Sequence, residues 1–179
     1  MGTFAYRMIG AALLDRGMYE TIEHDTRANL QALAVVLMSS MAAGIGATGV
    51  YGARAVTFAI FSGIALATWL AWAMLMFHLG TRVLPDVDTD TDLGQLLRTI
   101  GFAASPGLLQ VLASLPPLAI PVFAGTAVWM IAAMVVAVRQ ALDYRSIWRA
   151  VAVCCLAAAL SLALAVVGGF LFGPAAASA

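Results

Sequence analysis

Apolar stretches of membrane-spanning length fill most of this 179-residue chain. They can be delimited at residues 30–51, 55–79, 96–115, 118–138 and 148–172. An α-helix rises about 1.5 Å per residue and the hydrocarbon core is about 30 Å thick, so one crossing needs roughly 20 apolar residues. The pattern predicts an all-α, polytopic membrane protein built as a five-helix transmembrane bundle.

The composition supports this prediction and excludes an ordinary globular domain. Hydrophobic residues make up 63% of the chain and charged residues 10%, whereas globular domains contain about 25% charged residues. We expect one membrane domain, at residues 26–179. The formal net charge is zero and the arginines are scattered among several loops, which argues against nucleic acid as a partner.

Residues 1–25 form the second unit, a cytoplasmic interfacial segment. Apolar residues recur at helical spacing on both sides of a break near Asp15 and Gly17, which predicts one or two amphipathic helices lying at the membrane interface. Asp15 is the expected N-cap of the second helix, and Asp25 or Thr26 that of the first membrane helix. The segment is interpreted as a lid packed on the bundle, with a partner-binding surface as the alternative.

The arginines indicate how the chain is oriented in the membrane. When alternate loops are assigned to opposite sides, eight arginines fall on one side and only Arg54 on the other. By the positive-inside rule the N-terminus is cytoplasmic and the C-terminus exported. Because all basic residues are arginine and alanine is abundant, the coding sequence is taken as bacterial, so the expected location is the cell (inner) membrane.

Alternating carboxylates between Asp86 and Asp92 invite a comparison with calcium-binding loops. An EF-hand loop needs glycine at its sixth position and glutamate at its twelfth, and counting from Asp86 these positions are Thr91 and Leu97. We therefore expect no metal site here. Asp92 and Gln95 have instead the spacing of a capping box that opens the third membrane helix.

Ser105, Pro106 and Gly107 are a candidate break in the third membrane helix. Proline removes a backbone donor and kinks a helix, and membrane proteins tolerate this where neighbouring groups satisfy the freed carbonyl. Broken helices also form transport sites, where helix ends bind ions. No Asp, Glu or Lys accompanies this break, so kinked packing is the favoured interpretation.

The densest polar cluster lies between the fourth and fifth spans. It contains Arg139, Gln140, Asp143, Tyr144, Arg145 and Arg149. Arg139 and Asp143 are four residues apart, which would let them pair on a helix. The cluster is interpreted as an interfacial anchor, with contact to a lipid headgroup or a protein partner as the alternative.

Catalysis is disfavoured by what the spans contain. Membrane enzymes and proton-coupled carriers keep ionisable groups inside the bilayer, and no such group lies well inside any of the predicted spans. Phosphate-binding glycine loops, paired carboxylates in a cleft and Cys/His metal clusters are not recognisable either. We expect no enzyme activity, no catalytic or metal-binding residues and no cofactor.

Two strings carry a family resemblance: RTIGFAASP at residues 98–106, and VAVRQALDY at 136–144 with Trp129 ahead of it. Together with Leu14, Asp15, Tyr19 and the start of the first span at 31–33, they resemble the Yip1 domain family, especially its bacterial members. The resemblance covers nearly the whole chain. It implies five membrane helices, a cytoplasmic N-terminus and no enzyme activity.

The resemblance says less about partners. Eukaryotic members of the family are implied to act in vesicle trafficking through Rab GTPases, a system that bacteria lack, so only the architecture carries over. We expect a membrane-organising or partner-binding scaffold that acts through its cytoplasmic face. The alternative is a small transporter or lipid-handling protein that uses the proline-broken third and fourth helices. Expected partners are membrane lipids and an unidentified membrane or cytoplasmic protein, and a homo-oligomer stays open.

Overall fold

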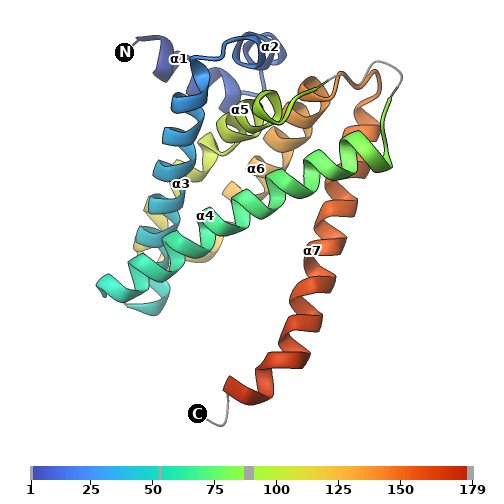
Figure 1. Cartoon of the computed structure of the whole chain (residues 1–179). Helices are drawn as coiled ribbons and strands as arrows, with labels where there is room; N and C mark the ends of the chain where they lie inside the picture. Colours follow the sequence, from blue (N-terminus) through green and yellow to red (C-terminus); the bar gives the residue numbers. More distant parts are fainter. Residues whose placement is uncertain (1, 53, 87–90, 177–179) are drawn as a thin grey trace.

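The computed structural model describes residues 2–52, 54–86 and 91–176. Every regular element in these ranges is helical, which confirms the all-α prediction (Figure 1). Two of the shorter elements, η2 and η3, are 3₁₀-helices, and η1 is a single π-helical turn. In chain order the elements are α1 (Gly2–Ala12), α2 (Arg16–His24), α3 (Ala28–Tyr51), α4 (Ala55–His78), η1 (Leu79–Val83), α5 (Leu93–Ala103), η2 (Ser105–Ser114), η3 (Pro116–Leu118), α6 (Ala119–Ala141) and α7 (Ile147–Ala176).

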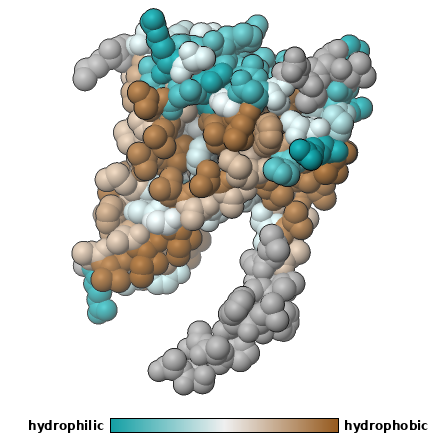
Figure 2. Space-filling view, viewed as in Figure 1, coloured by the Kyte–Doolittle hydropathy of each residue, from teal (hydrophilic) through white to brown (hydrophobic). Residues whose placement is uncertain are grey.

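The helices have the length and apolarity expected of a multi-pass membrane protein. Four helical stretches among the described residues could each cross a membrane: Ala28–Tyr51, Ala55–Val83, Leu93–Ser114 and Pro116–Ala141. The fifth predicted stretch falls on α7, which is 30 residues long. Figure 2 shows apolar side chains over the flanks of α3 and α4 and hydrophilic ones gathered at one end of the molecule.

The third span is not one continuous α-helix, and the change of helix type lies next to the candidate break residues. It consists of α5 followed by the 3₁₀-helix η2, and the change of helix type falls at Ala104. Pro106 sits at the start of η2, where its missing N–H is tolerated, and the Ser105 hydroxyl donates to the carbonyl of Phe102 at 2.6 Å. A freed carbonyl at the helix end is thereby satisfied.

Helix α3 lies directly against the main chain of η2. A Cβ atom on Gly46 would lie 2.3 Å from the carbonyl oxygen of Gln110, and one on Gly49 would lie 2.2 Å from that of Ala113. Only glycine permits this approach, because any larger side chain would collide with the backbone. The small residues of α3 therefore fix the position of the broken span.

We use "polar end" for the part of the molecule formed by α2, η1, the first turn of α5 and the connector 142–146 (top of Figure 1). Asp15 caps α2 as predicted, since its carboxylate accepts from the backbone N–H groups of Gly17 and Met18. The predicted capping box at α5 is also confirmed: Asp92 and Gln95 exchange two hydrogen bonds of 2.8 Å.

The predicted cap of α3 is wrong. The N-cap residue is Arg27, and its side chain makes no capping hydrogen bond. Asp25 instead ends α2, and its carboxylate accepts from the guanidinium of Arg7 at 2.6 Å and from the backbone N–H of Arg27 at 3.0 Å. These hydrogen bonds lower the pKa of Asp25. Asp25 therefore attaches α1, and its backbone carbonyl also accepts from the N–H of Ala28, the first residue of α3, at 2.8 Å.

Both N-terminal helices pack on the bundle. The indole N–H of Trp129 in α6 donates to the carbonyl of Ala12 at 2.7 Å, and the hydroxyl of Tyr19 donates to that of Ala11 at 3.1 Å. Tyr19 and Ile22 are fully buried in one apolar cluster, which also contains Phe102. A second cluster, around Leu96, Leu142 and Val153, joins α5 to the connector and α7.

Candidate functional site

The connector 142–146 turns the chain sharply from α6 into α7. Asp143 has φ 50°, in the left-handed region, and its N–H donates to the carbonyl of Gln140 at 3.1 Å. The N–H of Tyr144 donates to the carbonyl of Arg139 at 3.0 Å. This pair of hydrogen bonds is a Schellman motif, a common helix ending in which glycine usually takes the left-handed position. Here an aspartate takes it.

Arg139 stabilises this turn from the last turn of α6. Its Nε donates to the carbonyl of Tyr144 at 3.3 Å and its Nη2 to that of Arg145 at 3.2 Å. The predicted pairing of Arg139 with Asp143 assumed that both residues share one helix. That assumption is wrong, because α6 ends at Ala141 and the chain reverses at Asp143. The guanidinium of Arg139 instead donates to the backbone carbonyls of Tyr144 and Arg145, which follow the end of α6.

Tyr144 joins the connector to the end of α4. Its side chain is buried, and its hydroxyl lies 2.7 Å from the carbonyl oxygen of Leu84 and 3.2 Å from that of Gly80. Burial raises the pKa of Tyr144 to about 12, so the group remains a donor at all physiological pH values. Leu142 packs beside it so closely that a Cβ on Gly80 would lie 2.3 Å from Leu142 Cδ1.

The remaining residues of the predicted cluster serve different parts of the polar end. Arg149, in the first turn of α7, donates to the carbonyl of Pro85 at 2.9 Å and lies 3.6 Å from the carboxylate of Asp86. Arg145 is exposed. Positions 87–90 of the acidic stretch lie outside the described residues. The cluster thus holds the segment after α4 against the start of α7.

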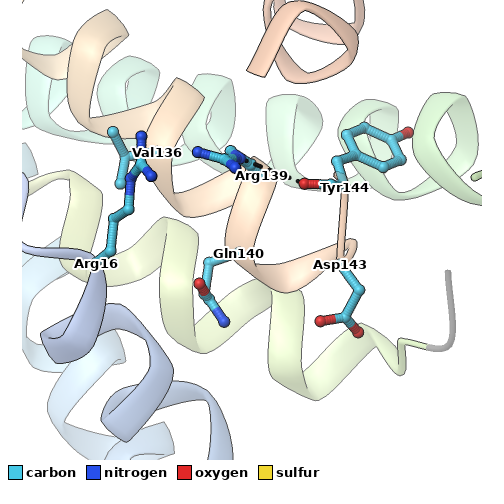
Figure 3. A pocket seen from close by; sticks show the side chains of 6 residues that line it. All are labelled: Arg16, Val136, Arg139, Gln140, Asp143 and Tyr144. Carbon is cyan, nitrogen blue, oxygen red and sulfur yellow. Dashed lines mark hydrogen bonds between the residues drawn. The ribbon is translucent and has the colours of Figure 1, made fainter. Parts of the chain in front are cut away.

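A cavity of about 310 Å³ opens beside this connector. Its lining combines residues predicted from the sequence with two that were not: Arg16, Val136, Arg139, Gln140, Asp143 and Tyr144. Figure 3 shows the guanidinium groups of Arg16 and Arg139 near Val136, and the carboxylate of Asp143 on the other side of α6. Arg16 is exposed, and no hydrogen bond or ion pair among the described residues engages it.

The floor of the polar end contains two buried charged residues that the sequence reasoning did not single out. Arg98 and Glu23 are 5% and 3% exposed. The Nε and Nη2 atoms of Arg98 donate to the backbone carbonyl of Glu23 at 3.2 and 2.7 Å, and its Nη1 donates to Asn29 Oδ1 at 3.0 Å. The Glu23 carboxylate accepts from Gln140 Nε2 at 3.3 Å. This network ties α2 to α3, α5 and α6.

Burial is the main influence on the Glu23 carboxyl group. It raises the pKa of Glu23, against the smaller opposing effects of the Gln140 hydrogen bond and the charges of His24 and Arg98. A sequence signal for this residue existed, since Glu23 is four residues after Tyr19 and one after Ile22, on the apolar face of α2. For Arg98 only its place in the RTIGFAASP string pointed to a role.

The candidate break residues lie elsewhere in the molecule. Ser105, Pro106 and Gly107 are buried inside the bundle, and none of them lines the cavity of the polar end. Gly107 faces α3, where a Cβ atom would lie 2.2 Å from the hydroxyl of Ser39. The two sets of predicted residues therefore belong to separate places, one at the polar end and one midway through the helices.

The fold and this site define a multi-pass α-helical membrane protein with a hydrogen-bonded polar end. A family model described as Yip1 domain matches residues 16–168, which include the polar end and all but the last part of α7. The chain belongs to the Yip1 domain family. No curated protein and no solved structure matches the chain.

Proposed function

We propose that this protein is a non-catalytic scaffold of the cell (inner) membrane that binds a protein partner at its polar end. In this proposal the polar end and the N-terminus face the cytoplasm and the C-terminus is exported. The arginine asymmetry supports this orientation, because Arg54 lies at the opposite turn and the other arginines lie on the N-terminal side of the membrane.

The observation that carries the proposal is the open cavity with two arginines at its wall. Arg139 is held in place by its main-chain hydrogen bonds, while Arg16 is exposed on the first turn of α2. Two guanidinium groups beside one cavity suit a carboxylate, since arginine binds carboxylates through paired N–H groups. The proposed partner therefore presents an acidic segment.

Site-specific photo-crosslinking in native membranes tests the proposal. Glu20 is exposed one turn after Arg16 on the same face of α2, so p-benzoylphenylalanine placed there reports on the cavity mouth without removing an arginine. We expect a discrete protein adduct, reduced at least tenfold by the charge reversal Arg16→Glu. Arg27→Glu is the matched control, because Arg27 is an exposed arginine that does not line the cavity.

The crosslinking result also separates the scaffold from its alternatives. Adducts that contain only lipid, or protein adducts that are equally strong with Arg16→Glu and Arg27→Glu, would contradict an arginine-dependent partner site. A small transporter or lipid-handling protein is the second candidate function, favoured by the ten-residue 3₁₀-helix in the middle of the bundle. Long 3₁₀ segments are uncommon and often accompany function.

A further inference from the structure

A second cavity, of about 130 Å³, lies between α3, α4, η2 and α6, and it is separate from the cavity of the polar end. We call it the inner cavity. Its wall includes Ser39 and Ser40 of α3, Trp69 of α4, Gln110 of η2 and Met130 of α6. These residues lie near the midpoints of α3, of the Ala55–Val83 stretch and of α6. The cavity therefore sits halfway along the helices, beside the break at Ser105–Gly107.

Three hydrogen-bonding side chains on this wall, Ser39, Ser40 and Trp69, have no side-chain partner within the described part of the chain. Ser39 and Ser40 are each 6% exposed, and neither hydroxyl makes a hydrogen bond within the described part of the chain. The indole N–H of Trp69 is buried and has no partner there. Hydroxyl groups in helices ordinarily donate to a carbonyl one turn earlier, as Thr126 does to Val122 at 2.8 Å.

Gln110 adds an amide to the same wall. Its side-chain Nε2 donates to the hydroxyl of Thr126 at 3.3 Å. No donor among the described residues reaches its side-chain oxygen Oε1. Buried polar groups in native proteins almost always have a partner, and on this wall the indole N–H of Trp69 is the fully buried group that has none among the described residues. Such a set of unpartnered donors and acceptors around one space points to an occupant.

We infer that the inner cavity is a binding site for a small neutral molecule rich in hydroxyl or amide groups. Neutrality follows from the lining, which offers donors and acceptors and contains no charged side chain. The space of about 130 Å³ corresponds to about four water molecules at roughly 30 Å³ each. A three-carbon polyol such as glycerol fits these limits, and a disaccharide does not. This inference is independent of the scaffold function.

Trp69 connects the site to the polar end. The same side chain also lines a groove of about 320 Å³, whose lining includes Asn29, Gly94 and Arg98. Trp69 therefore borders both spaces.

Cysteine accessibility in membrane vesicles tests the site. Ser40→Cys replaces one small side chain by another and is made in a Cys154→Ala, Cys155→Ala background, which removes both free cysteines. We expect methyl methanethiosulfonate to label this thiol at least tenfold faster than the thiol of Met41→Cys. Met41 is the next residue on α3 and is 50% exposed on its outer face, where lipid suppresses thiolate formation.

Glycerol should slow the labelling at position 40 severalfold, and sucrose at equal osmolarity should not.

Each outcome decides the inference. Equal labelling rates at positions 40 and 41 would mean a dry cavity, and fast labelling that glycerol leaves unchanged would mean a hydrated void without a binding site. Either result overturns the proposal. If Ser40→Cys fails to fold, as judged by gel filtration, Ser39→Cys gives the same test from the neighbouring position on the wall.

Discussion

Tyr144 links three segments of the polar end through one hydroxyl group. Its ring is buried with Leu142 and Leu96, and its oxygen lies within hydrogen-bonding distance of two carbonyls beyond the end of α4. One of these carbonyls, that of Gly80, belongs to the π-helical turn. The residue lay in the predicted interfacial cluster, whereas its actual partners are 64 and 60 residues away in the chain and could not be inferred from spacing.

Replacing Tyr144 by Phe should destabilise the protein by about 1–3 kcal/mol, because it removes the donor and leaves buried carbonyls unsatisfied. The melting temperature of the detergent-solubilised protein should fall by about 2–4 °C for each kcal/mol. Tyr6→Phe is the control, since Tyr6 is 68% exposed. Equal melting temperatures for the two variants would show that the Tyr144 hydroxyl contributes nothing.

The left-handed backbone at Asp143 gives a second prediction. Asp143→Gly and Asp143→Ala both remove the carboxylate, but only alanine retains a Cβ atom that is strained at φ 50°. We expect the glycine variant to be more stable than the alanine variant by about 1 kcal/mol, measured by thermal unfolding in detergent. A more stable alanine variant would mean that the backbone leaves the left-handed region in solution.

Glu23 gives a prediction about pH. Its folded-state pKa is raised above the ordinary 4.5, so its contribution to stability is fully present below that value and is lost as pH rises through the raised pKa. Glu23→Gln should therefore flatten the decline in stability above pH 4.5, because glutamine does not ionise and can still accept the Gln140 hydrogen bond. Glu20→Gln, an exposed change on the same helix, should leave the pH profile of the melting temperature unaltered. If the melting temperature of Glu23→Gln fell with pH as steeply as that of the wild type, Glu23 would not be the group responsible for the decline.

At the scale of elements, the packing of α3 on η2 depends on glycines, which have no side chain to keep the two backbones apart. Gly49→Ala would place a methyl group against the carbonyl of Ala113, so we expect a loss of about 1–3 kcal/mol from overpacking. Gly63→Ala is the matched control on α4, where a Cβ atom meets nothing within 4 Å. That change should be neutral or stabilise by up to about 1 kcal/mol. Equal thermal stabilities would mean that η2 is not held against α3.

The elements also show which inferences a sequence supports. Helix existence and the caps at Asp15 and Asp92 were predictable, because apolar length and capping are local properties. The 3₁₀ geometry of η2 was not predictable, since η2 packs against glycines of α3 that are far away in the sequence. The predicted Arg139–Asp143 pairing assumed one helix through both residues, but α6 ends at Ala141, and a spacing of four residues implies proximity only while the helix continues.

At the scale of the whole molecule, five crossings require the termini to lie on opposite sides of the membrane. Single cysteines at Thr3 and Ala179, in a background lacking Cys154 and Cys155, should react with a membrane-impermeant maleimide from opposite faces of the membrane. The arginine asymmetry predicts that position 3 is protected in intact cells and position 179 is not. Labelling of both from one side would require an even number of crossings.

The hydrogen bonds of the N-terminal helices have a consequence for the order of events on the ribosome. Ala12 and Glu23 are synthesised early, yet their partners Trp129 and Gln140 follow 117 residues later. Domains form from the N-terminus as the chain emerges, but here α1 and α2 cannot complete their contacts until α6 has been made and inserted. Helices α1 and α2 leave the ribosome first but are therefore among the last to reach their final positions. In the finished protein they join the N-terminus to α6.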